Sequence, residues 1–513
     1  MKDNWKNTIK GILFFLLIAT LFSVSYIQLP LYSSNQNTYF VHGLAMGGHG
    51  YLSNDWLVKT INPFPSFTGL VLIIYKYLHE YIFYLLHIIF MGIFIFSILG
   101  IISRTLCLKY KLFRFDRTTI FLISLLIFIH SWFLQYFTLH FFGFDSRVWF
   151  TYGFAYQYIL GSLFQPSIFG VFLVLSIYLW LSEKPYLAII SACVATNFHF
   201  SYLLTTSSLI LSYALINLFQ NRRYKQTAKL ILLSLIFIIP SLLYSYLMFS
   251  PTSSSIFRRA TDILINYRMP HHSNPSIWFN IVIIFKILLV IMSLYVVRGK
   301  RIFWIILVPF LVGLLLTIAQ ILTSSNYLAI LFPWRVSALL IPLAGSILIG
   351  KLVEIFVIKY RKRIPLFIPY IIILLSLSGS IFYYYHEYII VDNPANEMMN
   401  FIRENREENS LYLLPIEDDM NSIKLDKFRL HTGIPIVIDF KSHPYKDIEI
   451  LGWYERINDA KSFYSDPSCE RLEELKGKYS VTHIVFEKPL KADICPKLRE
   501  IYSNRNYLIY IVE

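Results

Sequence analysis

Long apolar runs recur along most of the chain and constrain its fold more than any other feature. A helix needs about 20 mainly apolar residues to cross a hydrocarbon core of roughly 30 Å. By that measure residues 1–385 contain eleven candidate spans, and we expect the first, which lacks an A-x-A-like cleavage site, to be retained. The spans are residues 10–29, 81–102, 119–134, 168–182, 185–199, 202–219, 228–249, 277–297, 302–322, 328–350 and 365–385. A chain that is 56% apolar and only 15% charged is typical of a multi-pass α-helical membrane protein and not of a soluble one.

Charge divides the chain into two parts. Residues 1–385 hold 29 Lys and Arg against 8 Asp and Glu, whereas the last 128 residues hold 17 against 23. The basic residues of the first part cluster between apolar runs, so the positive charge does not indicate a nucleic-acid partner. We therefore predict a transmembrane domain over 1–385 and a soluble acidic domain over 394–513.

The short basic loops predict the orientation of the chain. Cytoplasmic loops carry an excess of Lys and Arg, and all the strongly basic loops fall on one side if the N-terminus is inside. These loops are residues 104–117, 184, 222–225, 298–301 and 359–363. Eleven spans then place the C-terminal domain outside the cytoplasm, together with a long first outer loop over 31–80. The richness in Ile, Lys, Asn, Tyr and Phe suggests an AT-rich genome, and we expect a bacterial inner membrane.

The C-terminal segment has the pattern of a small α/β domain. We expect helices over 394–408 and 446–463, and strands over 411–414, 436–440, 481–486 and 507–512. Helices that alternate with buried strands favour a mostly parallel sheet. Cys469 and Cys495 both lie in this outer domain, where they are either bridged or two separate thiols.

Several motifs of known chemistry are missing from the sequence. It contains no C-x-x-C pair, no Walker A loop, no G-x-G-x-x-G, no H-E-x-x-H and no G-x-S-x-G. The sequence therefore disfavours an ATPase or a metalloprotease of known pattern.

Asp55 is the only carboxylate in the aromatic segment 39–57 of the first outer loop. Beside Trp56 it would sit in a partly apolar environment that raises its pKa, which suits a general base or a ligand of a divalent cation. Alternatively, Asp55 caps a helix that starts at Trp56. Asp145, in the second outer loop, is the second candidate for a catalytic acid. Alternatively, it forms a local ion pair with Arg147 or caps a helix.

Cationic side chains gather on the same outer side. Arg258, Arg259 and Arg268 share one outer loop, against the positive-inside trend, and Arg335 begins an apolar span at about headgroup depth. A guanidinium at that depth is costly unless it is paired, and its fork suits the phosphate of a lipid headgroup. Alternatively, Arg335 extends along Trp334 to the interface. His199, near the same depth, is either part of this site or a hydrogen-bonded structural histidine.

The arrangement resembles the C-type (GT-C) membrane glycosyltransferases: a long first outer loop with an Asp, a second outer acid, some eleven spans and an outer C-terminal α/β domain. The resemblance implies that Asp55 and Asp145 are the catalytic acids. It also implies a sugar donor linked to a polyprenyl phosphate, with Mg²⁺ or Mn²⁺ dependence left open because Asp55 lacks an adjacent acid. The donor would contact Arg335, Arg258, Arg259, Arg268, His199, Arg147 and Trp56.

Four motifs are also similar to those of a family of bacterial multi-pass membrane proteins, a resemblance that implies no particular activity. The motifs are Gly43-Leu44-Ala45 with Gly50–Leu57, Phe164–Ser167, Phe332–Arg335 and Asp439–Lys446.

Two other functions fit the same features. A lipid or polysaccharide transporter could use the outer basic groups, although transporters more often have charges at the bilayer midplane and repeated halves. A membrane-anchored binding protein could use residues 439–446 as its ligand loop. The sequence leaves the sugar, the acceptor and the oligomeric state open.

Overall fold

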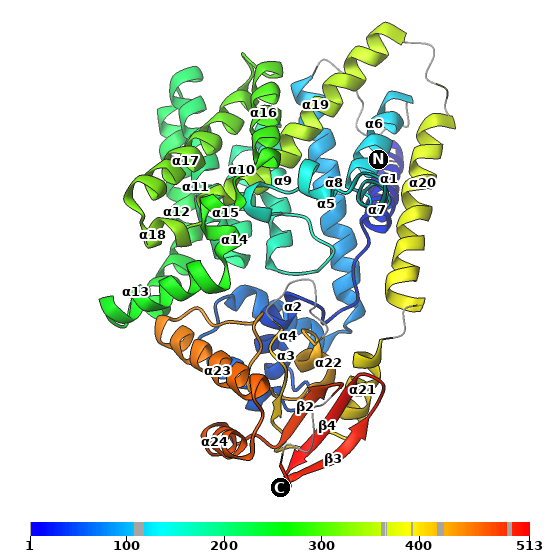
Figure 1. Cartoon of the computed structure of the whole chain (residues 1–513). Helices are drawn as coiled ribbons and strands as arrows, with labels where there is room; N and C mark the ends of the chain where they lie inside the picture. The colour runs from blue at the N-terminus through cyan, green and yellow to red at the C-terminus, as the bar shows by residue number, and fades with distance from the viewer. Residues whose placement is uncertain are drawn as a thin grey trace. The chain divides into compact units, whose positions relative to one another are not determined.

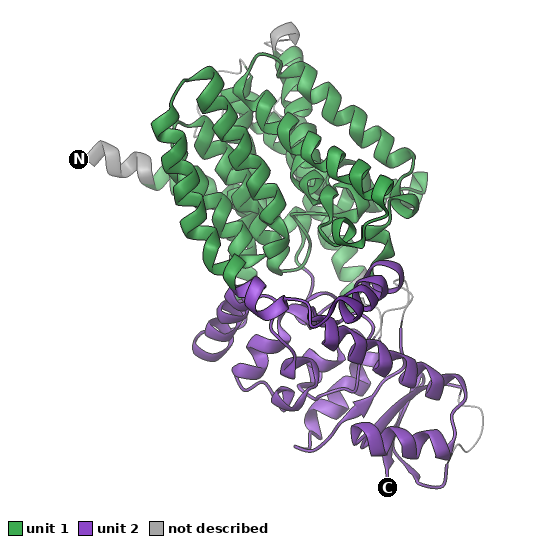
Figure 2. Cartoon of the chain, turned by 90° about the vertical axis from the view of Figure 1, so that its left-hand side faces the viewer, with its two compact units in different colours: residues 1–28, 83–243, 269–390 green, residues 29–82, 244–268, 391–513 purple. Residues whose placement is uncertain are grey.

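The computed structural model describes residues 2–106, 117–360, 365, 367–390, 393–417, 425–489 and 495–513. The chain forms two compact units, which Figure 2 shows in different colours. The helical unit comprises residues 1–28, 83–243 and 269–390. The mixed unit comprises residues 29–82, 244–268 and 391–513, so it joins the C-terminal segment to two stretches that precede it.

Most of the helical unit consists of apolar helices that run through its core (Figure 1). Its helices are α1 (Lys2–Tyr26), α5 (Tyr81–Thr105), α6 (Arg117–His130), α7 (Trp132–Phe142), α8 (Ser146–Phe150), α9 (Val171–Leu181), α10 (Pro185–Phe198), α11 (Leu203–Leu215), α12 (Tyr224–Phe249), α14 (Pro270–Ser273), α15 (Pro275–Trp278), α16 (Ile281–Val296), α17 (Arg301–Thr323), α18 (Asn326–Ile330), α19 (Ser337–Tyr360) and α20 (Phe367–Tyr385).

Each of the eleven expected spans overlaps a helix, but only some of these helices are long enough to cross a membrane. Within the described ranges, seven helices pass on length and composition. An eighth crossing is available if α6 and α7 form one span bent by 54°. The bend lies at Ser131, whose hydroxyl accepts a hydrogen bond from Leu134 N and so starts α7 afresh. The other three expected spans are the shorter apolar helices Pro166–Leu181, Pro185–Phe198 and Ile281–Val296.

Some residues used to predict the orientation lie outside the described ranges. They are Lys109, Lys111, Arg114, Arg361, Lys362 and Arg363.

The mixed unit combines short helices with a small sheet. Its helices are α2 (Gln36–Tyr39), α3 (Val41–Met46), α4 (Pro65–Tyr77), α13 (Ser254–Asp262), α21 (Pro394–Glu404), α22 (Phe428–Thr432), α23 (Asp447–Ser465) and α24 (Cys469–Tyr479). Its strands are β1 (Tyr412–Leu413), β2 (His483–Glu487), β3 (Leu498–Ser503) and β4 (Tyr507–Val512).

The sheet has the order β1-β2-β4-β3, and only β1 and β2 are parallel. The prediction of a mostly parallel sheet was wrong. β3 was not predicted; it returns into β4 through a turn too short for a parallel crossover, so the two strands pair antiparallel. The expected strand over 436–440 is also absent. Only Ile436 forms a bridge, to Tyr412, because the Asp439 carbonyl accepts a hydrogen bond from Trp453 instead.

The sheet packs on α21 and α22 through a buried core that includes Met398, Phe428 and Ile509. α21 begins at the predicted domain boundary, where the Asn393 side chain accepts a hydrogen bond from Ala395 N and Pro394 occupies the first turn. Cys469 and Cys495 form a disulfide, which decides between the two alternatives left open by the sequence.

Candidate functional site

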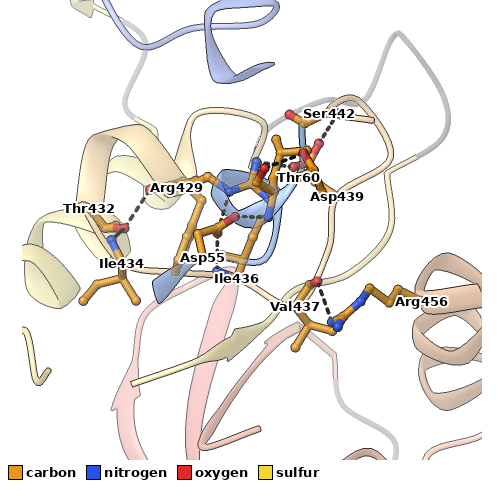
Figure 3. A network of polar contacts seen from close by, with 12 residues as sticks. Asp55, Thr60, Arg429, Thr432, Ile434, Ile436, Val437, Asp439, Ser442 and Arg456 are labelled. Carbon is orange, nitrogen blue, oxygen red and sulfur yellow. Dashed lines mark hydrogen bonds and ion pairs between the residues drawn. The ribbon is translucent and has the colours of Figure 1, made fainter. Parts of the chain in front are cut away.

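A buried ion network lies at the centre of the mixed unit. Arg429 Nε donates to Asp55 Oδ2 at 2.8 Å, and Arg429 Nη1 donates to Asp439 Oδ2 at 2.8 Å (Figure 3). The side chains of Asp55 and Arg429 are 0% and 1% exposed, and that of Asp439 is 13% exposed. Burial lowers the pKa of Arg429, but the two carboxylates outweigh it and leave the pKa above its ordinary value. The guanidinium therefore stays charged between two acids.

Asp55 has the contacts of a positioning residue and not those of a base. Its Oδ1 accepts from Leu57 N at 2.8 Å, where the short helix η2 (Leu57–Lys59) begins. Its Oδ2 accepts from Ile436 N at 3.0 Å as well as from Arg429. The capping interpretation of Asp55 thus agrees with the hydrogen bond from Leu57 N. A carboxylate whose two oxygens accept from three protein donors in a dry site is poorly placed to take a proton from an acceptor hydroxyl.

A second contact between the same two segments depends on glycine. Tyr51 N donates to Gly433 O at 2.7 Å, and His49 Nε2 lies 2.7 Å from Leu430 O. Gly50 has φ +55°, and a Cβ at this position would lie 2.3 Å from Gly433 O. The close approach of the two backbones therefore explains why residue 50 of the 43–57 motif is glycine.

Trp56 contacts the C-terminal segment instead of an open face. The Arg456 guanidinium lies 4.8 Å from the centre of the Trp56 ring and 4.4 Å from that of Tyr479. Arg456 also approaches Val437 O at 3.5 Å (Figure 3). Trp56 thus packs on α23 through a cation–π contact.

The three arginines predicted to act together are in different environments. Arg258 and Arg259 are exposed on α13. Arg268, at the end of the π-turn η7 (Ile263–Arg268), is mostly buried and donates from Nη2 to Lys441 O at 2.6 Å. Burial lowers the pKa of Arg268, with Tyr445 and Asp439 acting in the opposite direction. Only Arg268 therefore joins the interior of the mixed unit.

In the helical unit, Asp145 and Arg147 form a local pair. Asp145 Oδ1 accepts from Arg147 N at 2.8 Å and caps α8, and its Oδ2 lies 3.5 Å from Arg147 Nη2. Gln135 also donates to Asp145 Oδ2 at 2.9 Å. The Asp145 side chain remains 25% exposed. Asp145 thus combines a cap and an ion pair with an accessible carboxylate.

Arg335 and His199 also meet in the helical unit, at 3.1 Å between Nη1 and Nε2. Arg335 belongs to the turn η8 (Pro333–Val336), and its guanidinium lies 5.8 Å from the centre of the Phe332 ring. Its Nε is buried and has no hydrogen-bond partner among the residues that the structure describes. A buried donor left unpaired costs about 1–3 kcal/mol, so this guanidinium is not fully satisfied within the chain.

The loops that carry Asp145 and Arg335 pack together. Phe154 N donates to Ser337 Oγ at 2.7 Å, and the rings of Phe154 and Trp334 lie 4.6 Å apart. A Cβ on Gly153 would come within 2.5 Å of Ala338 N. Two of the three predicted site regions are therefore neighbours within one unit.

Residues 153–157 form a strained turn that sequence reasoning missed. Ala155 and Tyr156 have φ +50° and +56°, which is costly for side chains other than glycine. Two polar groups, one buried and one partly buried, hold the turn: Lys286 Nζ donates to Gly153 O at 2.8 Å, and His272 Nδ1 lies 2.7 Å from Ala155 O. Lys286, a charge inside the apolar run of α16, is the one signal that the sequence offered.

No group of three or more His, Cys, Asp or Glu side chains capable of holding a metal ion occurs in the described ranges. Of the remaining cysteines, Cys193 is buried and unbridged, and Cys107 lies outside those ranges. Arg429 was not predicted, because nothing in its local sequence distinguishes it from other basic residues of the tail.

Comparison with known families places one part of the chain. Residues 394–460 match a family described as "Domain of unknown function (DUF6798)". The matched segment contains Arg429 and Asp439, and it ends within α23. No curated protein matches the chain.

Proposed function

We propose that the chain is a multi-pass membrane glycosyltransferase that moves a sugar from a polyprenyl-phosphate-type donor to an acceptor on the outer side of the membrane. One observation carries the proposal: three segments far apart in the sequence, 29–82, 244–268 and 391–513, fold into one compact unit. They are the segments that the basic loops assign to the outer side. Long outer loops joined to an outer α/β domain are also the basis of the resemblance to C-type enzymes.

The compactness of the mixed unit supports the expected topology through a parity argument. A compact unit lies on one side of the membrane, so the chain crosses an even number of times between its segments. From 268 to 391, three helices are long enough to cross: Arg301–Thr323, Asn326–Val357 and Phe367–Tyr385. Three is odd, so the shorter helix α16 is the fourth crossing.

The same argument applies between residues 82 and 244. Three long helices cross there, namely Tyr81–Thr105, Phe200–Gln220 and Tyr224–Phe249. α9 and α10 are joined by a short turn and pack on each other, so they cross together or not at all. An even total therefore requires the bent pair α6–α7 to cross once. With α9 and α10 crossing as well, the count is the expected eleven.

The donor phosphate is held by the helical unit. Arg335 offers a guanidinium that is only partly satisfied by His199, and Arg147 likewise has a buried Nε that is unpaired among the described residues. Guanidinium groups in a poorly solvated site stabilise the charge that develops on a departing phosphate. Lys286 and His272 position the strained turn 153–157 beside the Arg335 turn.

Asp145 is the general base of the proposed reaction. The acceptor hydroxyl attacks the anomeric carbon, the bond from that carbon to the phosphate oxygen breaks, and the lipid phosphate leaves with the electron pair. The hydroxyl proton passes to Asp145, whose carboxylate keeps 25% exposure. Asp55 positions the segments of the mixed unit and takes no proton.

The test is sugar transfer by the purified full-length protein in proteoliposomes with a panel of radiolabelled polyprenyl-phosphate-linked hexoses. Asp145→Asn and Arg335→Gln should each lower the rate about 100-fold or more. Arg298→Gln, an exposed arginine on a short loop of the helical unit, is the control.

Two results would overturn the proposal. Lipid movement across the bilayer without formation of a glycoside would favour the transporter. Transfer that persists in Asp145→Asn would remove the general base from the mechanism.

A further inference from the structure

The segment Asp439–Lys446, hereafter the 439–446 loop, carries polar side chains that the fold does not satisfy. It packs against Tyr267 and Arg268: the Tyr267 ring lies 5.5 Å from that of Phe440, and Arg268 Nη2 donates to Lys441 O. The loop starts at Asp439, whose oxygens accept from Arg429 and from Ser442 N. Its backbone is therefore fixed by the buried ion network.

Five polar side-chain atoms at this place are buried and have no hydrogen-bond partner among the described residues. They are Tyr267 Oη, Arg268 Nε, Ser442 Oγ, and both ring nitrogens of His443. Ser442 and His443 are 1% and 5% exposed. Buried polar groups in folded proteins are nearly always paired, so a cluster of unpaired ones calls for an explanation. Four of the five can donate at the same time, since the neutral His443 ring carries one N–H and one acceptor nitrogen, and this favours a ligand that accepts hydrogen bonds.

The charges around the loop fit an anion. Arg268 uses one of its N–H groups on a backbone carbonyl, and its face lies 5.2 Å from the centre of the Phe440 ring, which fixes the plane of the guanidinium. Burial and the nearby Arg268 lower the pKa of Lys441, while Asp426 and Asp439 raise it. Of these two acids, Asp439 forms an ion pair with Arg429, which it shares with Asp55.

We propose that Arg268, Lys441, Ser442 and His443 form a binding site for a phosphoryl group, either a phosphate monoester or a diphosphate. Arg268 supplies a planar fork, Lys441 supplies a point charge, and the Ser442 hydroxyl and a His443 ring N–H supply neutral donors. The side chains of Tyr267, Lys441 and Tyr445 are half-buried, so we place the solvent-facing side of the site at these residues.

The site deepens the proposed function but does not require it. If the chain transfers sugar, the phosphoryl group at this site belongs to a phosphorylated acceptor, because the donor phosphate is held by the helical unit. If the chain transfers nothing, the same cluster still binds phosphate.

The test uses the full chain in nanodiscs of phosphatidylcholine. In one series, isothermal titration calorimetry measures the binding of inorganic pyrophosphate. A parallel series measures the binding of polyprenyl phosphate that is present in the bilayer. Arg268→Gln and Lys441→Met should each weaken binding about tenfold or more, because each removes a charge-assisted hydrogen bond. Arg403→Gln, an exposed arginine on α21, should bind like the wild type.

Ser442→Ala separates a loss of binding from a loss of folding. The Ser442 hydroxyl makes no hydrogen bond within the described chain, so its loss should leave thermal unfolding unchanged and weaken binding several-fold. Binding of polyprenyl phosphate alone identifies a lipid headgroup as the source, and equal binding of pyrophosphate identifies a soluble one. Either result supports the site.

The site is rejected if the wild type binds neither probe, or if folded Arg268→Gln and Ser442→Ala bind as tightly as the wild type. Sugar transfer measured on the same samples separates the two proposals. If the wild type transfers sugar and the variants bind the probes unchanged, only the phosphoryl site is rejected. If the wild type binds a probe but transfers no sugar, only the glycosyltransferase proposal is rejected.

Discussion

Arg429 Nε lies 2.8 Å from Asp55 Oδ2, a contact between side chains 374 residues apart in the sequence. It joins the 29–82 segment to the segment that matches the family of unknown function. Because Asp439 shares the same guanidinium, one arginine pairs with two acids in the interior. The residue with the strongest claim to catalysis in the sequence thus serves the assembly of the mixed unit.

Removal of one partner of this pair should destabilise the protein more than removal of both. Arg429→Met leaves Asp55 buried without its counter-charge, and we expect a loss of about 3–5 kcal/mol in unfolding free energy. Asp55→Leu combined with Arg429→Met should cost less than Arg429→Met alone. Thermal unfolding of the purified protein provides the measurement. An Asp55→Asn variant that unfolds like the wild type but has lost transfer would restore Asp55 as the base.

Gly50→Ala should be among the most damaging small substitutions in the mixed unit. It combines a positive φ with a collision at Gly433 O, and we expect a cost of about 1–3 kcal/mol or more. Gly48→Ala is the matched control, because Gly48 also has a positive φ (+83°) but no atom lies near its Cβ position. Equal unfolding temperatures for the two variants would argue against the close approach of residues 50 and 433.

The parity argument predicts opposite labelling at the two ends of α16. In a background without Cys107 and Cys193, Ser276→Cys should react with an impermeant maleimide added outside intact cells. Gly299→Cys should react only after the membrane is opened. Ser255→Cys should label from the outside like Ser276→Cys, because it belongs to the mixed unit. Labelling of residues 276 and 299 from the same side would mean that α16 does not cross.

Stability should fall in mild acid because of two histidines of the C-terminal segment. Burial and Arg268 lower the pKa of His443 to about 3, and burial with Arg403 and Lys427 lowers that of His431 to about 4. Both pKa values lie below the ordinary 6.5. At a pH between the lowered value and 6.5, each histidine is therefore protonated in the unfolded chain and neutral in the folded chain. The stabilisation is complete above about pH 6.5 and decreases as the pH falls, by about 2 kcal/mol per histidine at pH 5. His443→Gln should flatten the dependence of the unfolding temperature on pH between 7 and 5, whereas an unchanged slope would contradict the buried neutral ring.

Local sequence patterns indicated some contacts of the candidate site and missed others. The pair of Asp145 and Arg147 was one of the alternatives for Asp145, because the two residues are two positions apart in the sequence, and the structure shows that α8 begins between them. The contact between Arg335 and His199 was not predicted, although each residue was selected from its depth in the membrane. The strained turn held by Lys286 was missed, because positive φ values at Ala155 and Tyr156 have no signature in side-chain type.

The sequence by itself determined the alternation of apolar helices with polar segments and the start of the C-terminal helix at Asn393 and Pro394. These features follow from hydrophobic length and local capping, which involve neighbours along the chain. Only the tertiary structure decided that Asp55 pairs with Arg429, that Arg268 separates from Arg258, and that β3 makes the sheet mostly antiparallel. Each of these depends on which distant segments meet in space, and the free energy of burying a charge or pairing a strand edge is set by that partner and not by the residues on either side.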